Sequence, residues 1–343
     1  MSRLELVNVV AEAGAFRLGP IRLTAAPGEA TVLLGPSGAG KTTLLRAVAG
    51  FLPLRQGSVL LDGDRIDGLP PHRRGLGFVP PDLGLFGHRR VRRNVGYPLE
   101  LTGAPEIASQ TDRWLARFGL SHLADRYPAE LSSGERQRVA MARALAAGPR
   151  LLLWDEPFSA LDVESRDVLL RLVRELVEAE GLPLLLVTHD PTVTFAVASH
   201  VVVLEGGGVR FDGPPDRLAA GPLDRFTARF LGYENLYAAG DLDRVADPSL
   251  ARTLRTAAGP EGLVVPAEAV RWSADPSGAG SASVASVRWT AAGWVVAVRD
   301  GSLVFRARAA AGPPGVRVGD RVGLAVDPAA CRPLGAAPLG GPR

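Results

Sequence analysis

The stretch GPSGAGKTT, residues 35–43, contains Lys41, the single lysine among the 39 basic residues of this 343-residue chain. Its glycines, lysine and first threonine fit the pattern GxxxxGK[ST]. In that pattern the backbone N–H groups of a glycine-rich turn bind phosphates, and the lysine places a compact ammonium between the β- and γ-phosphates. A planar guanidinium is not a conservative replacement for this ammonium. We therefore interpret Lys41 as a lysine that phosphate chemistry requires in a chain that otherwise uses arginine.

The residues on either side of this stretch supply the structural context that the pattern needs. ATVLLG, residues 30–35, is a short apolar run typical of a strand buried on both faces, and TTLLRAVAG, residues 42–50, has helical spacing. A strand, a phosphate-binding turn and a helix in this order predict a P-loop, in which the Thr42 hydroxyl binds Mg²⁺. The expected nucleotide-binding residues of this segment are Gly35, Pro36, Ser37, Gly38, Ala39, Gly40, Lys41, Thr42 and Thr43.

A second buried strand ends in two acidic residues. LLLWDEP, residues 151–157, has the apolar run of such a strand, followed by Asp155 and Glu156. In P-loop proteins an aspartate at this place holds Mg²⁺, directly or through water. The glutamate can accept a proton from the water that attacks the γ-phosphate. The order of these motifs favours a hydrolytic site over two acids that only cap a strand.

Composition excludes several classes of function. The 39 basic and 36 acidic residues are mixed along the chain and give a net charge of +3, so we expect no nucleic-acid partner. No run approaches 18 apolar residues, and the N-terminus lacks the pattern of a signal peptide. The single cysteine, Cys331, cannot form an internal disulfide. We expect a soluble chain that reaches a membrane only through a partner.

The string LSSGERQRVAMARAL, residues 131–145, lies between the P-loop and the acidic strand. Ser132 and Glu135 form a capping-box pattern, which predicts the start of a helix. The string closely resembles the LSGGQ signature of the ATP-binding cassette (ABC) family, with Ser133 and Glu135 in place of a glycine and a glutamine. The resemblance implies that Ser132 and Gly134 contact the γ-phosphate of an ATP bound by a second subunit. It also implies a head-to-tail homodimer that closes around two ATP molecules.

Two further motifs fall in the order of that family. SALD, residues 159–162, resembles its D-loop, and the resemblance places Asp162 among the nucleotide-binding residues. LPLLLVTHD, residues 182–190, ends a third buried strand at His189, which matches the switch histidine and is implied to bind the γ-phosphate. The other histidines lack such a motif and are interpreted as structural: His72, His88, His122 and His200.

Two positions leave alternatives open. Phe16 lies upstream of the P-loop, where family members offer an aromatic ring to adenine, and simple core packing explains it equally well. In GFVPPDLGLF, residues 77–86, Pro81 stands where the family's Q-loop has a glutamine that reaches Mg²⁺ and the attacking water. Proline supplies no side-chain donor or acceptor. Either Asp82 or an ordered water replaces the glutamine, or turnover is slow.

The sequence predicts an α/β P-loop NTPase core, with a mostly parallel sheet and helices, followed by a small all-β, OB-like domain. The ATPase domain is expected over residues 1–235, with a helical subdomain at about 88–145 that docks on a membrane subunit. A linker is expected over 236–257. Residues 258–335 alternate apolar and polar positions in short strands and resemble the TOBE domain of importer ATPases. Trp272, Trp289 and Trp294 could line a ligand site there, but a place in the core of the small barrel is favoured. Residues 336–343 are expected to be a disordered tail.

The resemblance implies an ATP-hydrolysing importer subunit that uses ATP and Mg²⁺. It would work as a homodimer beneath transmembrane permease subunits, served indirectly by a solute-binding protein, on the cytoplasmic face of the membrane. A molybdate-like oxyanion is the favoured solute, with iron, thiamine and polyamine next. Two alternatives remain: a non-transport ABC ATPase, although neither tandem cassettes nor a long coiled coil is seen, and a weakly hydrolysing cassette that acts as a regulatory partner.

Overall fold

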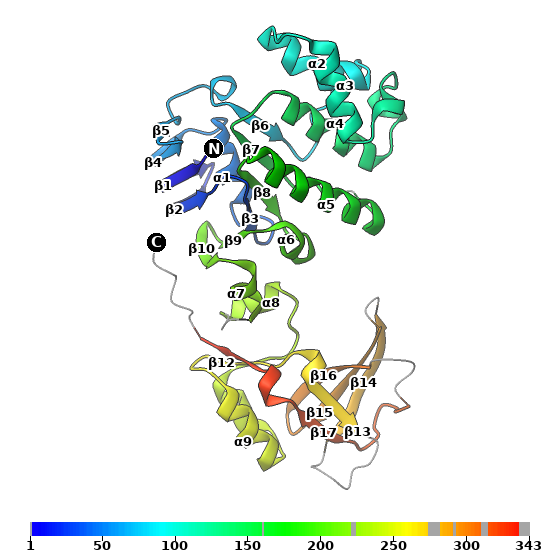
Figure 1. Cartoon of the computed structure of the whole chain (residues 1–343). Helices are drawn as coiled ribbons and strands as arrows, with labels where there is room; N and C mark the ends of the chain where they lie inside the picture. Colours follow the sequence, from blue (N-terminus) through cyan, green and yellow to red (C-terminus); the bar gives the residue numbers. More distant parts are fainter. Residues whose placement is uncertain are drawn as a thin grey trace. The chain divides into compact units, whose positions relative to one another are not determined.

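The computed structural model describes residues 2–159, 161–220, 224–273, 282–290, 293–309 and 315–335. The chain forms two compact units, residues 1–215 and 216–343 (Figure 1). The first unit contains every residue that the sequence predicts for the nucleotide site. None of the described helices is long and apolar enough to cross a membrane.

The centre of the first unit is a six-stranded sheet in the order β10-β9-β3-β8-β7-β6. Five strands run parallel, and β10 pairs antiparallel with β9. The strands β3, β7 and β8 are buried at every position, which explains why their sequences are continuous apolar runs. This confirms the predicted α/β core. The strands are β3 (Ala30–Leu34), β6 (Leu76–Val79), β7 (Leu151–Asp155), β8 (Leu184–Thr188), β9 (His200–Glu205) and β10 (Gly208–Gly213).

A second, antiparallel sheet of order β2-β1-β4-β5 belongs to the same unit. Its apolar side chains share one core with helix α1 and with residues of the central sheet. This sheet brings the start of β2 next to the P-loop, and the sequence analysis did not foresee it. Its strands are β1 (Leu4–Ala13), β2 (Phe16–Ala25), β4 (Leu54–Leu61) and β5 (Asp64–Arg65), and the helix is α1 (Lys41–Ala49).

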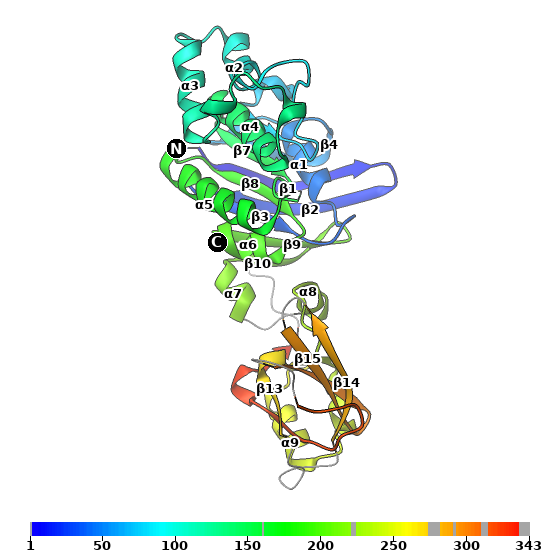
Figure 2. The ribbon, with the colours of Figure 1, turned by 90° about the vertical axis from the view of Figure 1, so that its right-hand side faces the viewer.

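Three helices, α2, α3 and α4, lie between β6 and β7, where a helical subdomain is expected at about 88–145 (Figure 2). They pack around Trp114 and Leu115 and share a core with the helices on one side of the central sheet. The helices of this unit beyond α1 are α2 (Val91–Thr102), α3 (Ile107–Arg117), α4 (Ser133–Ala146), α5 (Val163–Glu180) and α6 (Pro191–Val197). Short 3-10 turns lie at Pro71–Arg73, Ser121–Leu123 and Pro128–Glu130.

A buried arginine ends α1 and so fixes the helix that follows the P-loop. Arg74 is 5% exposed and donates to the carbonyl oxygens of Ala47 and Val48 at 3.2 and 2.7 Å. The Ala47 carbonyl also accepts from the N–H of Gly50 at 3.1 Å, so the arginine adds donors to the last turn of the helix. Gly50, with φ 85°, terminates the helix, and a Cβ there would lie 2.6 Å from the guanidinium carbon. A glycine is therefore required at this position.

The second unit is built mainly of short antiparallel strands around one core that includes Phe305. The strands are β11 (Leu236–Tyr237), β12 (Gly262–Val264), β13 (Val270–Ser273), β14 (Ser283–Thr290), β15 (Gly293–Asp300), β16 (Leu303–Ala309), β17 (Gly323–Val326) and β18 (Arg332–Leu334). The helices are α8 (Arg225–Phe230) and α9 (Pro248–Ala257), and α7 (Pro215–Ala220) begins at the boundary. Further 3-10 turns lie at Ala239–Arg244, Ala267–Ala269 and Pro328–Ala330.

The expected boundaries of this region need correction. The compact units divide after Pro215 rather than after residue 235, and residues 236–257 are not a linker. They form β11, a 3-10 turn and α9, and their apolar side chains belong to the second core. The physical reason is the helical spacing of Leu250 and Leu254, which buries one face of α9. The expected tail, 336–343, lies outside the described residues.

The three tryptophans of this unit do not share one environment, contrary to expectation. Trp272 packs against the core. Trp289 is 66% exposed, and its ring lies edge to face against that of Trp294, its partner on β15, with 5.5 Å between the ring centres. Only Trp272 therefore takes the predicted role.

We predict that Leu254→Ala destabilises the second unit alone. Leu254 is fully buried, so the loss of its side chain should cost about 2–5 kcal/mol of unfolding free energy. Differential scanning calorimetry should show one transition moved to lower temperature and the transition that ATP stabilises unchanged. Arg252→Ala, an exposed change on the same helix, is the control. No effect of Leu254→Ala would restore the linker interpretation.

Candidate active site

The P-loop connects β3 to α1, and its glycines adopt backbone conformations that other residues rarely take. Gly38 and Gly40 have φ of 80° and 103°. A Cβ on Gly35 would lie 2.4 Å from the carbonyl oxygen of Leu204, and one on Gly40 would lie 3.0 Å from the Phe16 ring. Ala39 closes the turn by donating its N–H to the Pro36 carbonyl at 3.2 Å. The glycine pattern is therefore needed for the close packing of this loop.

The remaining P-loop residues lie at the tip of the loop or at the start of the helix. Ser37 is exposed beside Gly38, whereas Thr43 is half-buried in the first turn of α1. Because the first N–H groups of a helix lack partners within it, the end of the loop can bind an anion. The binding of phosphate by these residues stays a prediction.

Lys41 is directed back over the loop. Its side chain is 6% exposed, and Nζ donates to the carbonyl oxygens of Gly35 at 2.7 Å and Pro36 at 2.9 Å. Burial lowers the pKa of the ammonium, and the nearby carboxylates of Glu156 and Asp155 act in the opposite direction. The ammonium is thus held by the loop itself, at the place where a phosphate oxygen would bind.

Asp155 has the features expected of a metal ligand. It is 1% exposed, and the Thr42 hydroxyl donates to its Oδ1 at 3.2 Å. Burial raises the pKa of this carboxyl. Its Oδ2 is buried and has no hydrogen-bond partner among the described residues. A hydroxyl and a buried carboxylate with a free oxygen suit Mg²⁺, which takes few protein ligands and completes its shell with water and phosphate oxygens.

Glu156 follows β7 in a strained conformation and faces the histidine that follows β8. Its φ is 52°, which is rare for a residue other than glycine and costs on the order of 1–3 kcal/mol. Its N–H donates to the carbonyl of Val187 at 3.0 Å. Nδ1 of His189 lies 2.9 Å from both carboxylate oxygens. The neighbouring strand thus fixes the backbone of Glu156, and His189 orients its carboxylate.

Sequence reasoning did not foresee this pair, since it assigned His189 to the phosphate alone. The signal was present, because both residues directly follow buried apolar runs. The carboxyl ends of neighbouring parallel strands meet at one edge of the sheet. What the sequence lacked was the knowledge that β7 and β8 are neighbours.

The signature residues lie at helix starts. Ser132 caps α4, and the predicted capping box is present, with the Ser132 N–H donating to Glu135 at 2.7 Å and the Glu135 N–H donating to the Ser132 hydroxyl at 3.3 Å. The backbone hydrogen bond from Ser132 lowers the pKa of Glu135. Asp162 caps α5, and a Cβ on Gly134 would lie 3.2 Å from the side chain of Leu161.

None of the hydrogen bonds recorded for Lys41, Thr42, Asp155 and Glu156 in the described structure involves Ser132, Gly134 or Asp162. The contact of Ser132, Gly134 and Asp162 with a nucleotide stays a prediction.

Phe16 is half-buried at the edge of the P-loop. Its ring closely approaches Gly40, and the same residue packs against the core that the two sheets share. The position suits both adenine stacking and core packing. The assignment of Phe16 to adenine stays a prediction.

The turn after β6 contains the two prolines and is held by helix α4. The Leu83 N–H donates to the Pro80 carbonyl at 2.9 Å. Arg143 of α4 donates to the carbonyls of Leu83 and Gly84, each at 2.8 Å. Burial lowers the pKa of Arg143, and nearby Asp82 acts in the opposite direction. Pro81 is exposed, and the hydrogen bonds of Arg143 hold the turn in which it lies. No sequence pattern indicated this role of Arg143.

Comparison with known proteins shows the family of the chain. Residues 18–159 match the model of a family described as "ABC transporter". The solved dimeric structure of the ATP-binding cassette MJ0796 in a post-hydrolysis state with ADP and Pi is 29% identical. It aligns with a TM-score of 0.56 over 62% of this chain and 98% of that one.

Curated bacterial relatives match over 232 to 247 residues of the chain. The ferric iron import ATP-binding protein FbpC of Streptomyces avermitilis is 44% identical over 67% of each chain. The putative 2-aminoethylphosphonate import ATP-binding protein PhnT of Salmonella typhimurium is 42% identical over 70% of this chain and 66% of its own length. The spermidine/putrescine protein PotA of Chromobacterium violaceum is 40% identical over 69% and 66%. The present chain spans about two thirds of the length of these relatives and belongs to the ABC family as an import-type transporter ATPase.

Proposed function

We propose that this chain hydrolyses ATP to drive the import of a solute, and that it works as a head-to-tail homodimer. The observation that carries the proposal is the pairing of Glu156 with His189 at the strand edge that also holds Asp155. A strained, histidine-oriented carboxylate beside a phosphate-binding loop suits a general base for water. The family membership supports the same chemistry.

The proposed reaction divides among few residues. Lys41 and the loop N–H groups bind the β- and γ-phosphates. Thr42 and Asp155 would hold Mg²⁺, which neutralises phosphate charge when bound. Glu156 accepts a proton as water attacks the γ-phosphorus, and the bond from that phosphorus to the β–γ bridging oxygen breaks to leave ADP. With Nδ1 on Glu156, the other nitrogen of His189 is left to meet the transferred phosphoryl group.

The homodimer would complete each site. Ser132, Gly134 and Asp162 lie at helix starts and are not engaged with the P-loop residues of their own chain, so a second copy is the natural recipient. The solved ATP-binding cassette structures that resemble this chain are dimeric. The partners would be transmembrane permease subunits on the cytoplasmic side of the membrane, with a solute-binding protein acting indirectly. The second unit is proposed as the TOBE-like domain.

We propose only the general class of the imported solute. The relatives reported above are named for ferric iron, 2-aminoethylphosphonate and polyamines. They give no support to the molybdate-like oxyanion that the sequence analysis favoured. Specificity resides in subunits other than this one, so the chain itself does not choose among these solutes.

The second candidate is a cassette that binds ATP and hydrolyses it weakly. One observation favours it: Pro81 carries no polar group at the position of the Q-loop glutamine, and the turn around it is held by Arg143. The complete set formed by Lys41, Thr42, Asp155 and Glu156 favours turnover. We therefore propose an active enzyme that is slowed at the Q-loop.

Lys41→Arg should lower ATP turnover by about 100-fold or more, although it restores the basic residue that the chain prefers. The guanidinium cannot occupy the buried position between the Gly35 and Pro36 carbonyls with the same geometry. Steady-state phosphate release is the measurement. Arg55→Lys, the reverse change at an exposed site, should leave the rate unchanged. Near-normal turnover of Lys41→Arg would refute the role given to the ammonium.

Glu156→Gln should bind ATP but accumulate as a dimer, because the proton acceptor is lost while the phosphate contacts remain. Gel filtration with ATP and Mg²⁺ tests this, and the same run with ADP is the control. A variant that stays monomeric with ATP would count against both the dimer and the role of Glu156.

Pro81→Gln should raise the basal ATPase rate by roughly 10- to 100-fold, which is the effect of one polar contact of about 1–3 kcal/mol that acts in the transition state. Pro81→Ala is the matched control and should gain little. Phosphate release from the three proteins decides the question. Equal rates would show that the missing glutamine is already compensated, and an equal gain from alanine would assign the effect to loop stiffness.

A further inference from the structure

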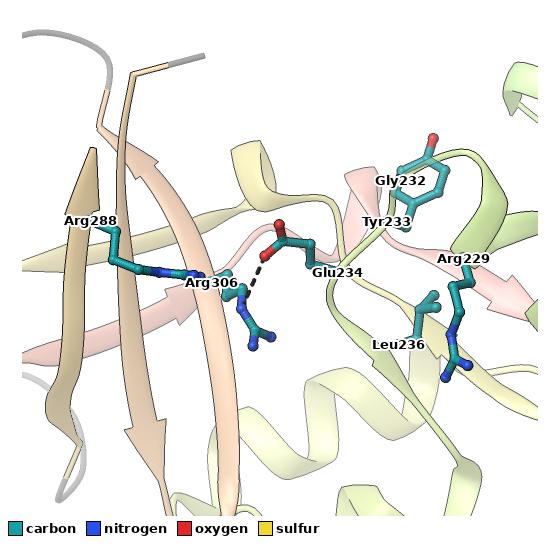
Figure 3. Close-up of a pocket in the computed structure, with 7 residues that line it drawn as sticks. All are labelled: Arg229, Gly232, Tyr233, Glu234, Leu236, Arg288 and Arg306. Atoms are coloured by element: carbon teal, nitrogen blue, oxygen red, sulfur yellow. Dashed lines mark ion pairs between the residues drawn. The ribbon is translucent and has the colours of Figure 1, made fainter. Parts of the chain in front are cut away.

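The second unit contains a cavity of about 490 Å³ that the proposed function does not use (Figure 3). One wall is the segment that joins α8 to β11, and the opposite wall is the sheet formed by β14, β15 and β16. Figure 3 shows Arg288 of β14 reaching across toward Arg306 of β16, beside Glu234 of the connecting segment. The lining residues are Arg229, Gly232, Tyr233, Glu234, Leu236, Arg288 and Arg306.

The cavity is positively charged. Its lining has three guanidinium groups and one carboxylate, an excess of two positive charges. The carboxylate of Glu234 is paired with Arg306, whose Nε lies 3.0 Å from it. Within the described parts of the chain, neither Arg229 nor Arg288 has an acidic partner. Like charges gathered around a cavity repel one another, and an anionic ligand would remove that repulsion.

A fourth arginine stands behind the wall with an unused donor. The guanidinium of Arg332, from β18, lies 5.2 Å from the centre of the Tyr233 ring. Its Nη1 is buried and finds no acceptor among the described residues. Buried N–H groups without a partner are rare in folded proteins. Arg332 does not itself line the cavity, but it adds a further positive charge behind Tyr233.

The walls are held in place before any ligand binds. Asn235, which is 1% exposed, donates to the carbonyl of Arg306 and accepts from its N–H, each at 2.8 Å. The Tyr237 hydroxyl donates to the carbonyl of Val304 at 2.9 Å. These hydrogen bonds tie the segment that carries Glu234 to the backbone of β16, the strand that carries Arg306. A preformed site binds a ligand without the cost of ordering its own walls.

We propose that this cavity binds a small organic anion with two or more phosphate or carboxylate groups. Its volume falls within the range of about 300–1,000 Å³ typical of sites for organic ligands. Guanidinium groups pair with both kinds of anion through two parallel hydrogen bonds. Tyr233 and Leu236 supply an aromatic and an apolar surface for the carbon skeleton. Glu234 competes with the ligand for Arg306.

The test is isothermal titration calorimetry on the full chain, without Mg²⁺ and at low salt, with citrate and 2,3-bisphosphoglycerate as the two probes. At least one probe should bind with a dissociation constant below about 1 mM. Arg229→Gln and Arg288→Gln should each weaken binding by about tenfold or more, and Glu234→Gln should tighten it. Because citrate carries only carboxylates, binding of citrate would show that carboxylates suffice, and binding of 2,3-bisphosphoglycerate without citrate would show that phosphate groups are needed. Both arginines are exposed, and unchanged melting temperatures verify that the variants fold.

Two control variants test whether the probes bind at this cavity rather than elsewhere on the chain. Arg252→Gln, at an exposed position of α9, should leave binding unchanged. Lys41→Ala should also leave it unchanged, since the P-loop is the other anion site of the chain. Dissociation constants above about 1 mM for both probes would overturn the proposal. Equal weakening by Arg252→Gln would assign binding to the general charge of the unit, and loss in Lys41→Ala would assign it to the P-loop.

Discussion

The parallel pairing of β3, β8 and β7 is the constraint on which the active site depends. Because the three strands are buried on both faces and run in one direction, their carboxyl ends lie at one edge of the sheet. The P-loop follows the first strand, His189 the second and Glu156 the third. A slip of one register between β7 and β8 would separate the Glu156 carboxylate from the imidazole. The contact between Glu156 N–H and Val187 fixes that register at the strand end.

Burial then sets the electrostatics of this edge. Burial raises the pKa of Asp155 and lowers that of Lys41, so both charged forms are disfavoured by desolvation in the absence of ligands. The charge of each group partly opposes the shift that burial causes in the pKa of the other. A magnesium nucleotide bound as we propose would supply what each group lacks, a cation beside the free oxygen of Asp155 and phosphate oxygens beside Lys41. The site is thus built for a ligand of mixed charge, and the strain at Glu156 is consistent with a carboxylate aimed for chemistry.

The turn after β6 shows how a departure from the family pattern is accommodated. Arg143 extends from α4 to two carbonyls of that turn, and α4 is the helix that Ser132 caps. Any displacement of this helix is therefore transmitted to the turn through two charge-assisted hydrogen bonds. In this chain Arg143 therefore links helix α4 to the turn after β6.

The sequence by itself determined the P-loop, the acidic strand end, the capped signature helix and the α/β class, because each depends on local chemistry or on an uninterrupted apolar run. It also determined the helical subdomain, from helical spacing. Only the tertiary structure decided which strands are neighbours, and hence that His189 meets Glu156, that Phe16 lies against Gly40 and that Arg143 holds the proline turn. It also decided that α9 belongs to the second core and that three arginines surround one cavity. These contacts join residues far apart in the chain. The type of a side chain does not identify its partner, because an arginine on a strand gives the same sequence pattern whether it faces solvent or a cavity.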